Sequence, residues 1–391
     1  MAKSIPALVT PEVLRWAREL DRISIAEIAP KLKVSEEKIL AWESGQEYPT
    51  LLQAKDLAKR YRVPFVYFYL PSVPLRAKRI DKVDYRTFSH TEDELFMSRE
   101  LRWLLRDIEE RRDAMIELYA LEDVQPVRQE VYIAPKATEE EFAETLRNIL
   151  ALTPDCQIGF RKPEHALAHC IGQLEKRDYL IFQASAIEPR EMRGLSVAYD
   201  VFPIIVLNRK DEQSARLFTL CHELVHVLSR TSGICNTTGE NETTAKELEL
   251  FCNRVAGLAL VPTEMLDSNL HTCKIRNYGL NDTEVYALSR DFAVSKEVII
   301  HRLWKTGVIT ERQYYDTLKR YSDEYLAYKN AKKEKSGFLS PAIDKGTQVG
   351  KLYARTVISA YNTEKISSRE ASGYLLNLHV KHFNKIERWC Y

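Results

Sequence analysis

Apolar residues recur three or four positions apart along most of the chain, which is the spacing of amphipathic helices. Five short helices are predicted between residues 10 and 70. A turn at Lys33-Val34 separates the second of them from the third, which Ser35 can cap and which ends at Gly45. This succession predicts a helix-turn-helix within the first 74 residues.

The pattern after residue 90 predicts longer helices, at 91–121, 139–152 and 163–176. Between Tyr179 and Asn208 it changes to the period of strands, and three are predicted, at 179–182, 195–199 and 203–208. Further helices are predicted at 280–305, 350–361 and 367–387. The fold class is therefore predicted to be α+β, mainly helical, with a small sheet.

Charge and composition restrict the partners of the protein. The 57 Lys and Arg residues nearly equal the 56 Asp and Glu residues, so any binding of nucleic acid must be local. The seven Cys residues include no Cys-x-x-Cys pair, which argues against a thiolate zinc site and for reduced thiols. Neither a signal peptide nor an apolar run of membrane-spanning length is found. We therefore expect a soluble, cytoplasmic protein without membrane contact.

Candidate chemistry is concentrated in segment 218–228, where His222, Glu223 and His226 form the pattern His-Glu-x-x-His in an apolar run. On a helix, residues four apart project from one face, so both imidazoles can bind one Zn²⁺ ion. Glu223 lies beside them, where it can take a proton from a water molecule. Leucines at helical spacing favour a helix, which Asp211 or Ser214 could cap.

A catalytic zinc ion needs three protein ligands and one open position. On the next predicted helix the candidates for the third ligand are Glu242, Glu247 and Glu249. Glu249 and Asn253 share one face, so Glu249 could bind zinc while Asn253 orients a ligand histidine. A second pair at ligand spacing, His165 and His169, has no acidic partner nearby, so surface or packing roles are favoured there.

Segment 244–262 resembles the glutamate-bearing helix of the ImmA/IrrE family of zinc peptidases, with Glu, Asn, Ala and a closing Pro at the positions of Glu249, Asn253, Ala256 and Pro262. Further stretches resemble the same family, at 182–185, 192–194, 203–208 and 218–220. The resemblance implies that His222, His226 and Glu249 are the zinc ligands, and that Glu223 is the general base and later the proton donor.

Zinc peptidases of this general plan pair an extended substrate with an edge strand near the metal. Either Ile204–Leu207 or Leu195–Ala198 could act in this way. Alternatively, both strands are interior and only support the motif helix.

The N-terminal helices resemble the Xre/Cro-type DNA-binding domain through Ile28-Ala29, Val34-Ser35, Ile39, Trp42-Glu43-Ser44-Gly45 and Pro49-Thr50. The resemblance implies that the third helix faces a DNA major groove, with Ser35, Lys38 and Trp42 as contact residues. Residues 1–70 hold 11 Lys and Arg against 9 Asp and Glu, a small positive balance. A helical module for dimerisation or for a protein partner is therefore the alternative, and a homodimer would suit either function.

These predictions divide the chain into four parts: a Xre/Cro-type helix-turn-helix domain (1–74), a basic linker and helical connector (75–177), a zincin-like ImmA/IrrE peptidase core (178–268) and a helical C-terminal region (269–391). The resemblance implies a zinc endopeptidase that cleaves a repressor or other regulatory protein, encoded nearby, to control transcription in a stress or mobile-element response. The alternative is a DNA-binding regulator or antitoxin-like protein whose zinc site is structural or vestigial. Glu223 favours the peptidase, because a structural site needs no base beside its ligands.

Overall fold

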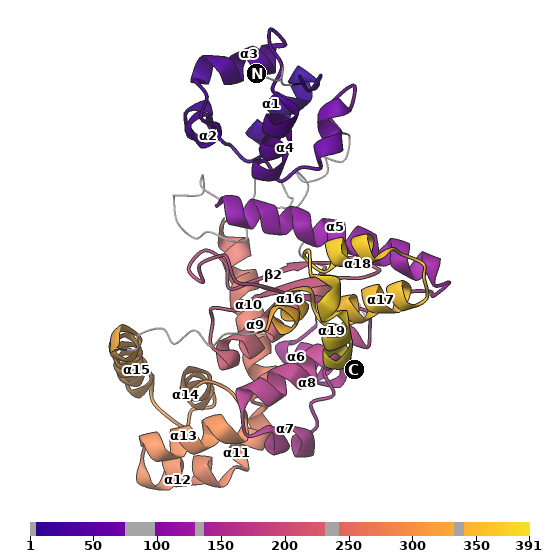
Figure 1. Cartoon of the computed structure of the whole chain (residues 1–391). Coiled ribbons are helices and arrows are strands. Elements are labelled where there is room, and N and C mark those ends of the chain that lie inside the picture. The colour runs from indigo at the N-terminus through magenta and orange to yellow at the C-terminus, as the bar shows by residue number, and fades with distance from the viewer. Residues whose placement is uncertain (1–4, 75–97, 130–136, 231–241, 332–339) are drawn as a thin grey trace. The chain divides into compact units, whose positions relative to one another are not determined.

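The computed structural model describes residues 5–74, 98–129, 137–230, 242–331 and 340–391 (Figure 1). The chain falls into two compact units, one formed by Met1–Val83 with Asp93–Asp107 and the other by Asp84–Glu92 with Ile108–Tyr391. Helices predominate, and the described residues contain one sheet of three strands. The fold is therefore α+β and mainly helical, as predicted.

The first unit begins with short helices: α1 (Pro11–Leu20), α2 (Ile25–Leu32), α3 (Glu36–Ser44), α4 (Leu51–Arg60) and the 3-10 helix η1 (Phe65–Tyr69). The side chains of Ser24, Ser35 and Thr50 each accept the N–H of the third residue in α2, α3 and α4, so the predicted cap at Ser35 is confirmed and the other two helices begin in the same way. Lys33, between α2 and α3, has a left-handed φ of 56° that turns the chain sharply. The predicted fifth helix is only the 3-10 helix η1, because Pro64 and Pro71 confine it.

Helix α5 (Arg99–Leu121) contributes residues to both units. In the first unit, the fully buried carboxylate of Asp21 accepts hydrogen bonds from Trp103 Nε1 at 2.6 Å and from Arg106 Nη2 at 3.0 Å. These bonds attach the beginning of α5 to the end of α1. The predicted basic linker at 75–82 and the predicted start of the long helix at Thr91 lie outside the described residues.

The sheet of the second unit consists of β1 (Leu180–Ala184), β2 (Gly194–Val197) and β3 (Ile204–Asn208), in the order β1-β3-β2. β3 pairs in parallel with β1 and antiparallel with β2. The segment Ile204–Leu207 thus belongs to the central strand, and both of its edges already pair with neighbouring strands. Of the two candidates for substrate pairing, only the strand at Leu195–Ala198 lies at an edge of this sheet.

Helices on both sides of the sheet build the core of the second unit. α9 (Gln213–Ser229) packs on β2, β3 and α10 (Glu242–Leu260), and α10 packs on α6 (Glu139–Ile149). β1 is covered by α8 (Pro163–Glu175) and α16 (Pro341–Val349). One apolar cluster runs from Phe142 to Tyr321, across the domain boundaries predicted at residues 177 and 268. The helix with the His-Glu-x-x-His motif is therefore embedded in a large common core.

The remaining helices of the second unit are α7 (Pro154–Phe160), α11 (Thr263–Asp267), α12 (Leu270–Tyr278), α13 (Asp282–Asp291), α14 (Lys296–Lys305), α15 (Glu311–Ala331), α17 (Lys351–Asn362), α18 (Ser368–Tyr374), η5 (Val380–His382) and α19 (Phe383–Cys390). The predicted helical pair at 280–305 is confirmed as α13 and α14. The single helix predicted at 367–387 is wrong, because Leu376 and Asn377 both have a left-handed φ of 58° and end it. No helix among the described residues has both the length and the apolar character needed to span a bilayer.

Candidate active site

The His-Glu-x-x-His motif lies on α9, whose apolar side is fixed in the core. Leu220, Leu224 and Leu228 recur every four residues on that side and are at most 1% exposed. The helix begins after Glu212, which makes no capping bond, and not after Asp211 or Ser214 as predicted. The motif is thus positioned by burial of its neighbours rather than by a cap.

Two helices bring three potential ligand side chains together. Nε2 of His222 and Nε2 of His226 are 3.1 Å apart on α9. Glu249 on α10 places Oε2 3.1 Å from Nε2 of His222 and Oε1 3.2 Å from Nε2 of His226. Ligand atoms of a tetrahedral zinc site are about 3.4 Å apart, given zinc–ligand bonds of about 2.0 to 2.1 Å. The three side chains are therefore spaced as ligands of one small cation.

The hydrogen bond of His222 to Asn253 decides which ring nitrogen can bind a cation. Oδ1 of Asn253 lies 3.0 Å from Nδ1 of His222. An amide oxygen only accepts, so Nδ1 carries the hydrogen and a neutral His222 presents a lone pair at Nε2. This lone pair faces a carboxylate oxygen of Glu249, and two acceptors repel unless His222 is protonated or a cation lies between them. The donor set therefore fits a metal ion.

The electrostatics of the cluster agree with this fit. Burial lowers the pKa of His222, but the hydrogen bond with Glu249 and the charges of Glu223 and Glu249 outweigh it, so the pKa lies above 6.5. Burial raises the pKa of Glu249, but its bonds with His222 and His226 outweigh it, so the pKa lies well below 4.5. Glu249 is therefore held as a carboxylate, the form that binds a cation.

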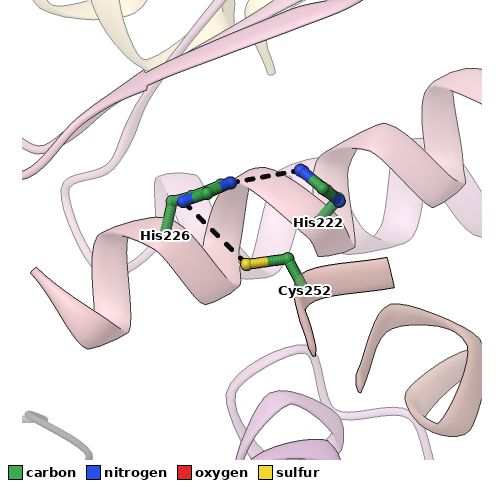
Figure 2. A group of neighbouring side chains, drawn as sticks. All are labelled: His222, His226 and Cys252. Carbon is green, nitrogen blue, oxygen red and sulfur yellow. Dashed lines mark hydrogen bonds between the residues drawn. The ribbon is translucent and has the colours of Figure 1, made fainter. Parts of the chain in front are cut away.

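Cys252 offers a further potential ligand atom, its Sγ, which was not predicted from the sequence. His222, His226 and Cys252 place one ligand atom each within 4.8 Å of one another. However, the Sγ atom of Cys252 lies 3.9 Å from Nδ1 of His226, on the ring edge opposite to the Nε2 atom that contacts His222 (Figure 2). Glu249 contacts both Nε2 atoms, so it is better placed than Cys252 to complete the ligand set.

Glu223 lies on α9 beside the ligands and contacts the edge strand. It is 8% exposed, and its Oε2 accepts a hydrogen bond from Ser196 Oγ on β2 at 2.7 Å. Gly194, two residues earlier on β2, leaves room for the same carboxylate, because a Cβ atom there would lie 2.7 Å from Oε1 of Glu223. No contact of Gly194 or Ser196 with Glu223 was predicted from the sequence, although both residues lie on one face of the strand that precedes the motif.

Two of the three ligand side chains are partly exposed to solvent. The side chains of His222 and Glu249 are 13% and 21% exposed, whereas that of His226 is 7% exposed. A catalytic metal needs an open position, whereas the ligands of a structural metal close around it. A cavity of about 180 Å³ is bounded by Ala198 after β2 and by Val227 and Leu228 of α9, which follow His226 in the chain.

Other residues with candidate roles lie apart from this cluster or face elsewhere. His165 and His169 contact the backbone oxygens of Phe160 and Leu150, respectively. They do not converge on a shared ligand position. Glu247 is exposed, and the side chain of Glu242 lies outside the described residues.

The residues predicted to contact DNA have different surroundings in the first unit. Ser35 and Lys38 are exposed on α3, where Ser35 caps the helix. Trp42 is fully buried in the centre of the unit, so its predicted contact with DNA is wrong. The reason is packing, because the large indole fills the apolar core among α1, α3 and α4.

Residues 181–304 match the peptidase M78 family model, which is described as the IrrE N-terminal-like domain. This part of the chain is similar to a metallopeptidase of the ImmA/IrrE type. The match includes β2, β3, α9 and α10, and thus every residue of the cluster described above. It covers less than half of the chain and does not reach the N-terminal helices. No curated protein matches the chain.

Proposed function

We propose that the protein is a zinc-dependent endopeptidase with His222, His226 and Glu249 as the zinc ligands and Glu223 as the general base. The observation that carries this proposal is that the Nε2 atoms of His222 and His226 and the two oxygens of Glu249 converge with distances of 3.1 to 3.2 Å. The carboxylate of Glu223 lies beside the two histidines on α9. Asn253 supports the ligand set, because its bond to Nδ1 directs the lone pair of His222 toward Glu249.

When bound, zinc would supply Lewis-acid chemistry, by polarising a peptide carbonyl and making water more acidic. The residues of the chain supply the proton transfers. Ser196 occupies Oε2 of Glu223, so Oε1 is the oxygen that accepts the proton of the attacking water. Glu223 then carries this proton to the leaving amine. Its low exposure of 8% limits competition from bulk water.

Substrate is proposed to bind along β2. This strand pairs with β3 on one side, and an extended peptide can add to its other side by backbone hydrogen bonds. The site then lies beside the peptide, because Ser196 on β2 contacts Glu223. The cavity at Ala198 and Val227 continues along the same strand and helix, and is of a size to receive one side chain of the peptide.

The N-terminal helices are proposed to bind double-stranded DNA, and the substrate to be a regulatory protein such as a repressor, in a cytoplasmic regulatory pathway. Support for DNA binding comes from the short turn between α2 and α3 and from the exposure of Ser35 and Lys38 on α3. The alternative, a DNA-binding regulator with a structural metal, is less well supported, because a structural site needs neither the exposed ligands nor Glu223.

Cleavage of a proteome-derived peptide library by the zinc-loaded protein tests the peptidase function. Glu223→Gln should lower the rate by about 10² to 10⁴, the usual contribution of a general base. Glu247→Gln is the matched control, since it makes the same change at an exposed position of α10. Equal cleavage by wild type and Glu223→Gln, or no cleavage by either, would reject the peptidase function and favour the regulator.

A further inference from the structure

Strand β2 presents two small residues to the motif helix. Side chains two apart on a strand share one face, so Gly194 and Ser196 lie on the same face of β2. Both meet Glu223 of α9: Ser196 by a hydrogen bond at 2.7 Å, and Gly194 because the carboxylate occupies the space that a Cβ atom at this position would need. Both residues are buried. The base is therefore enclosed by the strand that would bind substrate.

Gly194 is explained by space and not by backbone conformation. It is not among the glycines with positive φ, so other residues could adopt its conformation. A Cβ atom at this position would lie 2.3 Å from Cγ2 of Thr219, 2.7 Å from Oε1 of Glu223 and 3.0 Å from its Cγ. These distances are far below van der Waals contact. Any side chain at 194 would thus displace Glu223 or Thr219.

Ser196 restricts the carboxylate of Glu223 by attraction, whereas Gly194 acts by leaving space. Its hydroxyl is the donor to Oε2, because an ionised carboxylate only accepts hydrogen bonds. A bond between a hydroxyl and a carboxylate is among the stronger hydrogen bonds, and the pair is shielded from water. One oxygen is therefore fixed, and the other is directed to the space that Gly194 leaves free.

We propose that Gly194 and Ser196 are positioning residues that hold the carboxylate of Glu223 for proton transfer with the reacting water: Ser196 fixes Oε2, and Gly194 leaves the space beside Oε1. The inference rests on the proposed peptidase function and extends it to the edge strand. Because the same strand would pair with substrate, the scissile bond and the base are placed by one rigid element. This arrangement reduces the motions that would otherwise misalign the proton transfer.

The test measures kcat and KM for a peptide taken from the library cleavage, together with zinc content. Ser196→Ala should lower kcat about 10-fold or more with KM and zinc content nearly unchanged, and Ser196→Thr should restore most of the rate. Gly194→Ala should lower kcat at least as much. Ser289→Ala is the matched control, because Ser289 is another buried serine and its hydroxyl donates to the backbone oxygen of Tyr286 within its own helix.

A second measurement tests the contact without catalysis. Ser196→Ala should lower the urea midpoint of unfolding in the wild-type background, but not in a Glu223→Ala background, where its acceptor is missing. Equal shifts in both backgrounds would overturn the inference. So would cleavage that depends on Glu223 but proceeds in Ser196→Ala at the rate of the Ser289→Ala control. Cleavage that is independent of Glu223, by contrast, overturns the proposed peptidase function itself.

Discussion

Replacing Glu175 by alanine should loosen the start of α17, at a distance from the candidate active site. Glu175 is the last residue of α8 and is only 7% exposed. Its Oε1 accepts the backbone N–H of Leu352 at 3.1 Å, in the first turn of α17. The residue before this helix is Gly350, which has no side chain to cap it. Glu175 therefore acts as a cap supplied by another helix.

The expected cost follows from the group that loses its partner. Leu352 is 4% exposed, so its N–H cannot turn to water when the carboxylate is removed. An unsatisfied buried donor costs about 1 to 3 kcal/mol, and loss of a helix cap typically about 1 kcal/mol. Relief of the buried charge offsets part of this loss. We expect a net destabilisation of about 2 kcal/mol.

Hydrogen exchange of the α17 amides measures this effect directly. A loss of about 2 kcal/mol corresponds to exchange about 30-fold faster. The control is Glu164→Ala, an exposed position on the same helix whose carboxylate lies 4.0 Å from Lys162. Equal exchange in both variants, or slower exchange in Glu175→Ala, would refute the capping argument.

The pH dependence of the same site has a definite sign. Burial raises the pKa of Glu175 above 4.5, despite the opposing N–H bonds from Leu352 and Lys351. The folded protein then binds this proton more tightly than the unfolded chain, so the contribution of Glu175 to stability declines as pH rises above 4.5. Glu175→Gln keeps an acceptor without the charge. It should therefore gain stability relative to wild type as the pH rises.

Substitutions at three further positions test the packing within each of the two units. Asp21→Ala should destabilise the first unit by about 1 to 3 kcal/mol, because it removes the buried acceptor of the half-buried donors on Trp103 and Arg106; urea unfolding checks it, and a loss below 1 kcal/mol contradicts it. Gly350→Ala should lower the melting temperature, since φ is +80° and a Cβ atom would lie 2.5 Å from the carbonyl oxygen of Ile181; an unchanged melting temperature contradicts it. Trp42→Ala should cost about 3 to 5 kcal/mol in urea unfolding and Trp42→Phe clearly less, because Nε1 of Trp42 makes no hydrogen bond; equal losses contradict it.

Local signals in the sequence predicted most of the helices correctly. Serine before an apolar period located the start of α3, because its side chain satisfies a free N–H group of the first turn, and α2, α4 and α14 begin with the same kind of cap. Spacing on a helix placed His222 and His226 on one face, whereas the choice of Glu249 among three acids came from the resemblance to the ImmA/IrrE family. The break after α18 was missed, because Leu376 carries no local signal for a left-handed conformation and the preference of Asn377 for that conformation was not used.

Features that depend on tertiary packing could not be predicted in this way. The order of the strands decides that β2 and not β3 lies at an edge, and no local pattern contains that order. Trp42 was named as a DNA contact through the resemblance, although a tryptophan in such a helix more often packs inside, and it is buried in the core. Ser196 and Cys252 became candidates only when β2 and α10 were placed against α9. Alternation of side chains along β2 predicts that Gly194 and Ser196 share one face, but it does not predict that this face meets Glu223.

X-ray absorption at the zinc edge of the purified protein tests the central claim most directly, because it reports the atoms bound to the metal. If zinc lies between His222, His226 and Glu249, the spectrum should contain nitrogen and oxygen neighbours at about 2.0 to 2.1 Å and no sulfur. A sulfur neighbour at about 2.3 Å would instead assign Cys252 as a ligand and remove Glu249 from the site. Absence of zinc from the protein after incubation with the metal would contradict the account as a whole.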